Sequence, residues 1–169
     1  MGYLLMQTDF GGTSGAMIGV AKIVSEDLKV FQISNVIPKF NIEKAAESLL
    51  EVIPFWPAKT VFVSVVDPGV GTDRKASVAL LENGSYVVSP DNGIYDLINR
   101  KMPIREIREI DQSINRYKGN EWSNKSDIFH GRDIFAYCGS RLASGVITYE
   151  QVGDAYPLKW HVSRPTSRR

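Results

Sequence analysis

The stretch TVFVSVV, Thr60 to Val66, decides the fold because nearly all of its side chains are apolar and most are β-branched. A strand with one face in water would alternate apolar and polar residues. A continuous apolar run of this length is instead typical of a central strand in a parallel sheet, which helices cover on both faces. We therefore expect this stretch to form the centre of such a sheet.

Strands and helices alternate on the N-terminal side of this stretch. Tyr3–Thr8 predicts a strand, and apolar side chains then recur at helical spacing over Ala16–Val24. Lys29–Ser34 predicts a second strand, and Asn41 is suited to cap the helix that follows it. This alternation indicates an α/β fold with a mostly parallel central sheet flanked by helices.

Two further features lie on the C-terminal side. Asn83-Gly84 separates two apolar runs and is a strong hairpin signal. Residues His130 to Ser144 carry apolar side chains at helical intervals, which predicts a helix. Cys138 lies within that pattern, so we interpret it as a core residue rather than a nucleophile.

Three loops begin where an apolar strand ends: Thr8 to Gly15, Asp67 to Arg74, and Pro90 to Gly93. Ligands of open α/β sheets bind at loops beyond the carboxyl ends of the strands. Two of these loops place a carboxylate, Asp9 or Asp67, directly after the strand. Any one loop alone is better explained as ordinary turn chemistry, in which Asp bonds its own backbone. The three together favour a site.

Composition excludes several classes of function. The 169 residues suit one domain, and the formal net charge of +1 offers no electrostatic footprint for nucleic acid or an acidic membrane. No apolar run reaches the roughly 18 residues of a membrane span. One cysteine excludes an intramolecular disulfide, and with only two histidines a closed zinc site is not expected. The N-terminus lacks the features of a signal peptide, which predicts the cytoplasm.

Four motifs carry a resemblance to a known family: TDFG (Thr8–Gly11), VVDPGVG (Val65–Gly71), PDNG (Pro90–Gly93) and FHGRDIFA (Phe129–Ala136). In this order they resemble the S-adenosyl-L-methionine (SAM) hydroxide adenosyltransferases, or SAM hydrolases, which are related to fluorinating and chlorinating enzymes. The resemblance implies hydrolysis of SAM to adenosine and L-methionine, through attack of water on the ribose 5′ carbon. SAM is then the substrate, with no cofactor and no metal.

The resemblance also assigns site residues. It implies a catalytic set of Asp67, Arg74 and His130, and substrate binding by Asp9 and Phe10, with the Asp9 carboxylate accepting bonds from the ribose hydroxyls. Displacing a neutral thioether from a sulfonium needs only a water held in line that gives up a proton, which suits a carboxylate oriented by an arginine. The alternatives are an ion pair that braces a loop, a histidine at a helix start, and an Asp9 that caps the following helix.

The sequence departs from the family in three places. Residues 12–16 lack the acidic residue usual after TDFG, and Gln32–Asn35 replaces a family pattern at the end of the second strand. The resemblance runs from about Tyr3 to about Gly153, so we expect an α/β domain at residues 1–153 and a short, basic, mobile tail at 154–169. The family normally adds a C-terminal β-barrel domain, which supplies the adenine pocket, often to the active site of a neighbouring subunit in a trimer. That domain is absent from this range. We therefore expect a homotrimer only for a chain that carries it.

Two other functions stay open at this point. One is a SAM-dependent halogenase, which the presence of Asp67 disfavours because a carboxylate repels a halide, and halide-using relatives lack it. The other is a non-catalytic or vestigial nucleoside-binding domain. We also expect an exposed apolar surface that promotes self-association, with Phe55, Trp56 and Trp122 as candidates.

Overall fold

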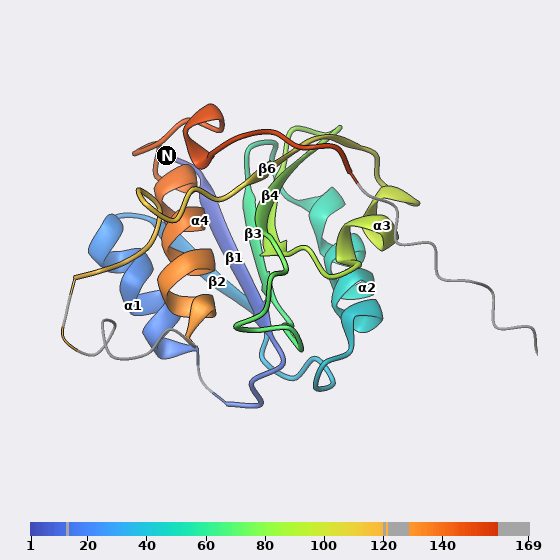
Figure 1. Ribbon diagram of the computed structural model, residues 1–169, viewed down its shortest axis with the longest axis horizontal. Coiled ribbons are helices and arrows are strands. Elements are labelled where there is room, and N and C mark those ends of the chain that lie inside the picture. The colour runs from blue at the N-terminus through green and yellow to red at the C-terminus, as the bar shows by residue number, and fades with distance from the viewer. Residues whose placement is uncertain (13, 120, 122–128, 159–169) are drawn as a thin grey trace, which may run out of the picture.

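Over residues 1–12, 14–119, 121 and 129–158, which the computed structural model describes, the chain forms a six-stranded sheet in the order β2-β1-β3-β5-β4-β6 (Figure 1). The strands are β1 (Tyr3–Thr8), β2 (Lys29–Ser34), β3 (Val61–Val65), β4 (Ala76–Leu81), β5 (Tyr86–Pro90) and β6 (Ile104–Glu109). The helices are α1 (Gly15–Val24), α2 (Ile42–Val52), α3 (Ile94–Asn99) and α4 (Tyr137–Ala143), with a π-helical turn at Gly131–Ala136 and 3₁₀ turns at Ile53–Phe55 and Glu150–Val152.

The sheet is mixed but mostly parallel, as predicted. Strand β1 pairs in parallel with β2 and β3, and β3 pairs in parallel with β5. Strand β4 pairs antiparallel with β5 and β6. Every residue of β3 is buried, which confirms that the Thr60–Val66 run forms an interior strand.

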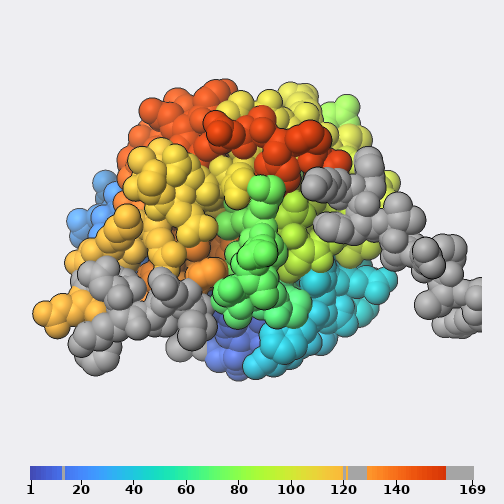
Figure 2. Space-filling view, in the orientation of Figure 1, coloured from blue at the N-terminus to red at the C-terminus, as the bar shows by residue number. Residues whose placement is uncertain are grey.

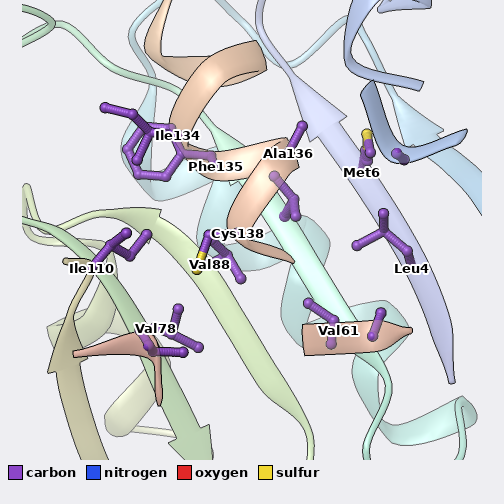
Figure 3. Packing of buried hydrophobic residues seen from close by; sticks show 14 of the residues in the cluster. Leu4, Met6, Val61, Val78, Val88, Ile110, Ile134, Phe135, Ala136 and Cys138 are labelled. Atoms are coloured by element: carbon purple, nitrogen blue, oxygen red, sulfur yellow. The ribbon is translucent and has the colours of Figure 1, made fainter. Parts of the chain in front are cut away.

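Helices cover both faces of the sheet, α1 and α4 on one face and α2 and α3 on the other (Figure 1). Alternate residues of β3 therefore enter two cores: Val61, Val63 and Val65 face α1 and α4, whereas Phe62 faces α2 and α3. Figure 3 shows the first of these cores, in which Cys138 lies fully buried among aliphatic side chains. Burial raises the pKa of its thiol to about 12, so the interpretation of Cys138 as a core residue is confirmed.

Local signals produce the expected boundaries. The Asn41 side chain caps α2 by accepting a bond of 2.9 Å from the Lys44 amide. The β4–β5 hairpin turns at Asn83-Gly84, where Gly84 has φ +84°, a conformation that costs glycine little. Strand β6 and helix α3 were not predicted. The predicted helix from His130 begins instead with the π-helical turn.

Other expectations need correction. Phe55 is 86% exposed, as expected, but Trp56 is half-buried because its ring packs 5.5 Å from Tyr3 and 5.3 Å from Phe31. Trp122 lies outside the described residues. The first residues of the expected tail lie on the sheet, where Ala155 bridges to Arg108 of β6. The rest of the expected tail, residues 159–169, lies outside the described residues.

Candidate active site

A pocket of about 250 Å³ lies at the carboxyl ends of β1 and β3. Strand β2 lies on one side of β1 and β3 lies on its other side, so the direction in which strands are added reverses at β1. In open α/β sheets, ligands bind at this topological switch point. Figure 2 shows the loop after β3, in green, at the surface with cyan residues of the α2 region beside it. The residues that line the pocket include Asp9, Phe10, Lys39, Phe40, Asp67 and Phe129.

Asp67 and Arg74 form a buried ion pair on this loop. Arg74 Nε donates to Asp67 Oδ1 and Oδ2 at 3.0 and 3.2 Å, and Nη2 donates to Oδ2. The Asp67 side chain is only 6% exposed and that of Arg74 only 9%. Because two nitrogens of the planar guanidinium, Nε and Nη2, donate to the carboxylate, they fix its orientation. Oδ2 accepts two of these bonds and Oδ1 one, so Oδ1 keeps the larger capacity for a further donor.

Arg74 also joins His130 to this pair. Its Nη2 atom lies 2.8 Å from His130 Nδ1. A guanidinium can only donate, so Nδ1 must be the acceptor, and the proton of the neutral imidazole then resides on Nε2. The carboxylate of Asp67, the guanidinium of Arg74 and the imidazole of His130 thus form one hydrogen-bonded series, although 56 positions separate Arg74 from His130.

Asp9, which follows β1, is the second carboxylate that lines the pocket. Its Oδ2 accepts a bond of 2.7 Å from the amide of Phe40, a residue held at φ +61°, which is strained for a side chain of this size. Asp9 is only 8% exposed. Helix α1 begins after Ser14, so the alternative in which Asp9 caps that helix is wrong. Oδ1 of Asp9 accepts no bond within the described part of the chain.

Aromatic rings form the third wall. The rings of Phe10 and Phe129 lie 6.1 Å apart, and the guanidinium of Arg132 stacks 4.7 Å from the Phe129 ring. A Cβ atom on Gly131 would lie 3.3 Å from Phe10 and from Val65, so glycine allows the π-helical turn to approach this wall. Arg132 pairs in turn with the buried carboxylate of Asp133.

The structure brings together all five residues singled out from the sequence: three line the pocket (Asp9, Phe10, Asp67), and Arg74 with His130 lies behind Asp67. The Pro90–Gly93 loop does not line it, because β3 separates β5 from β1. Its Asn92 instead supports the β3 end by donating to Val66 O at 2.8 Å.

The loop after β2 takes that place and supplies Lys39 and Phe40, which sequence reasoning missed. The sequence signal that could have identified these two residues was the position of their loop directly after a predicted strand.

No group of three or more His, Cys, Asp or Glu is placed to hold a metal ion within the described residues. In the same part of the chain, no helix has both the length and the apolar character to cross a membrane.

A family model for the SAM hydroxide adenosyltransferase N-terminal domain matches residues 4–153. The chain belongs to this family. Among curated family members, it is 39% identical over 146 residues to an (R)-S-adenosyl-L-methionine hydrolase of Methanocaldococcus jannaschii, an alignment that covers 82% of this chain and 52% of the relative. It is 33% identical over 157 residues to an enzyme of the same name from Thermus thermophilus, with 90% and 60% covered.

Solved structures of the same fold agree with this membership. A crystal structure of an uncharacterized conserved protein from Thermotoga maritima is 36% identical, with a TM-score of 0.85 over 95% of this chain and 61% of that protein. A conserved hypothetical protein from Thermus thermophilus is 29% identical, with a TM-score of 0.70. The chain spans about half the length of the curated relatives it matches.

Proposed function

We propose that the protein hydrolyses SAM to adenosine and L-methionine. One observation carries the proposal: a buried carboxylate, Asp67, is oriented by Arg74 and linked through it to His130, in the pocket that Asp9 also lines. Even a buried ion pair contributes little net stability, because both charges lose their hydration, so the convergence of two buried carboxylates on one pocket favours a functional reason. Membership of the family supports this choice of reaction.

In the proposed reaction a water attacks the ribose 5′ carbon from the side opposite the sulfur. The new C5′–O bond forms as the C5′–S bond breaks, and the electron pair of the broken bond goes to sulfur, giving the neutral thioether of methionine. Because that leaving group is neutral, it needs no general acid. The water must only be held in line and lose a proton as it attacks.

Each residue then has a separate task. Asp67 Oδ1 accepts the hydrogen bond and the proton of the water. Arg74 fixes the carboxylate plane, and His130, which accepts a bond from Arg74, positions the guanidinium. Asp9 accepts the ribose hydroxyls, for which a carboxylate that takes two donors is suited.

The pocket suits the reacting ribose rather than all of SAM. A volume of about 250 Å³ lies just below the ~300–1,000 Å³ typical of small-molecule sites. We propose that the adenine is held outside this pocket, by a β-barrel domain of the kind the family adds, and that a chain carrying that domain forms a homotrimer.

The experiment is a turnover assay in water enriched in ¹⁸O, with chromatography and mass spectrometry of the products. Hydrolysis releases methionine and adenosine whose 5′ oxygen carries the label. A 5′-halogenated nucleoside formed with added chloride would indicate a halogenase instead. Binding of SAM without product would indicate the non-catalytic alternative, and unlabelled adenosine would exclude attack by water.

A further inference from the structure

We propose that Lys39 binds the α-carboxylate of the substrate and so selects SAM over sulfonium nucleosides that lack this group. The inference deepens the proposed function and rests on it. Its basis is the charge distribution around the pocket, in which one cation remains available for an anionic substrate group.

Lys39 is the one cationic side chain that lines the pocket within the described residues. Arg74 lies behind the wall, and its guanidinium is already engaged by Asp67 and His130. Lys39 forms no ion pair with any described residue; its ammonium lies 5.5 Å from the centre of the Phe40 ring. The side chain is exposed, so its flexible four-carbon stem can turn toward a ligand at the pocket mouth.

The backbone places this lysine close to the proposed ribose site. The neighbouring residue, Phe40, donates its amide to the Asp9 carboxylate at 2.7 Å, and consecutive Cα atoms are about 3.8 Å apart. In SAM, the sulfonium follows the ribose 5′ carbon, and the carboxylate follows the sulfonium after a short alkyl chain. Lys39 lines the same pocket as Asp9 and Asp67, so its ammonium can approach the amino-acid end of a substrate whose ribose lies in that pocket.

The charge of SAM makes the position of Lys39 informative. SAM carries two cationic groups, the sulfonium and the ammonium, and one anionic group, the carboxylate. Asp9 and Asp67 face the cationic centre with negative charge, whereas a lysine at the same pocket would repel the substrate unless it met the carboxylate. The loop at residues 11–16 carries no charged side chain, so it offers the carboxylate no competing cation.

The experiment measures binding by titration calorimetry, with the 169-residue chain and three probes: SAM, decarboxylated SAM and adenosine. We expect Lys39→Met to weaken SAM binding about five- to tenfold, the range of a partly exposed charge-assisted hydrogen bond. Decarboxylated SAM and adenosine should bind as before. Lys39→Glu should reverse the preference, so that decarboxylated SAM binds more tightly than SAM.

Lys44→Met is the matched control, because it removes the same charge from an exposed lysine of α2 that does not line the pocket. Equal losses in Lys39→Met and Lys44→Met would overturn the inference, since the effect would be one of net charge. An unchanged preference for SAM in Lys39→Met would also overturn it, while adenosine and SAM binding by the unaltered chain would leave the proposed function intact. No binding of any probe by the unaltered chain would overturn the inference, because Lys39 would then hold no substrate in this pocket.

Discussion

The two ends of the sheet carry hollows of opposite character. The hollow at the amino ends of the parallel strands is the larger, about 610 Å³ against about 250 Å³, and its charged side chains, Lys59 and Glu150, are exposed. At the carboxyl ends, Asp9 and Asp67 are each only 8% exposed. Removing a carboxylate from water is costly, whereas a hollow between exposed side chains is not. Buried charge, rather than volume, therefore distinguishes the candidate active site.

Polar groups at the amino end serve the fold. Tyr149 lines the larger hollow, and its hydroxyl lies 3.1 Å from the carbonyl oxygens of Val78 in β4 and Glu106 in β6. It thereby joins two paired strands. The comparison predicts that substitutions at the carboxyl end change binding and turnover, and that those at the amino end change stability.

The largest effect is expected from Asp67→Asn. The amide keeps the size of the side chain and can still accept a bond from Arg74, but it cannot take the proton of the water. SAM turnover should fall ~100-fold or more, with little change in KM. Glu150→Gln, the matched change at the larger hollow, should alter turnover by roughly twofold at most. Melting curves should accompany the kinetics, and normal turnover in Asp67→Asn would remove the water-activating role.

The next effect is expected from Asp9→Asn. Its carbonyl oxygen can still accept from the Phe40 amide, so the strained loop keeps its anchor. Loss of the charge should weaken adenosine binding by about 1.5 to 3 kcal/mol, the contribution of a hydrogen bond to a charged group. Calorimetry with adenosine measures this directly. A variant that binds adenosine normally but turns over slowly would move Asp9 from substrate binding to catalysis.

Tyr149→Phe tests the other end of the sheet. Removing the hydroxyl leaves buried carbonyl oxygens with one donor fewer, so the free energy of unfolding should fall by about 1 to 2 kcal/mol. Urea denaturation measures that change. Adenosine binding should be unaffected below the unfolding transition; a loss of binding at full stability would contradict the division between the two ends.

The smallest effect concerns pH and Cys138, which belongs to neither hollow. Burial raises the pKa of its thiol to about 12, whereas an unfolded chain ionises it near its ordinary value of 9.0. Above that value the unfolded state binds fewer protons than the folded state, so stability is complete below about pH 8 and declines as pH rises toward 12. The free energy of unfolding should be roughly 1 kcal/mol lower at pH 9.5 than at pH 8.

Cys138→Ala is the control for this pH dependence. The variant will be less stable at every pH because it leaves a cavity, but its stability should change less between pH 8 and pH 9.5. The range stops at pH 9.5 because exposed tyrosines ionise near 10. An equal decline in both proteins would assign the pH dependence to other groups.

Prediction from the sequence worked where one local property decides the structure. The Thr60–Val66 run indicated an interior strand because its burial requires apolar residues on both faces. Asn41 indicated the start of α2 because capping is a contact within one turn. Strand β6 was missed because its IREIRE sequence repeats every third residue, and the six residues of α3 are too few for helical periodicity to show.

For the site, the sequence by itself determined which residues have the required chemistry, since the motifs around Asp9, Asp67 and His130 and their resemblance to a family are properties of the chain. Only the tertiary structure decided which of them meet. Strand order places the loops after β1, β2 and β3 around one pocket and excludes the Pro90–Gly93 loop. The Arg74–His130 contact and the bond from Phe40 to Asp9 join residues that are distant in sequence, and packing alone brings them within bonding range.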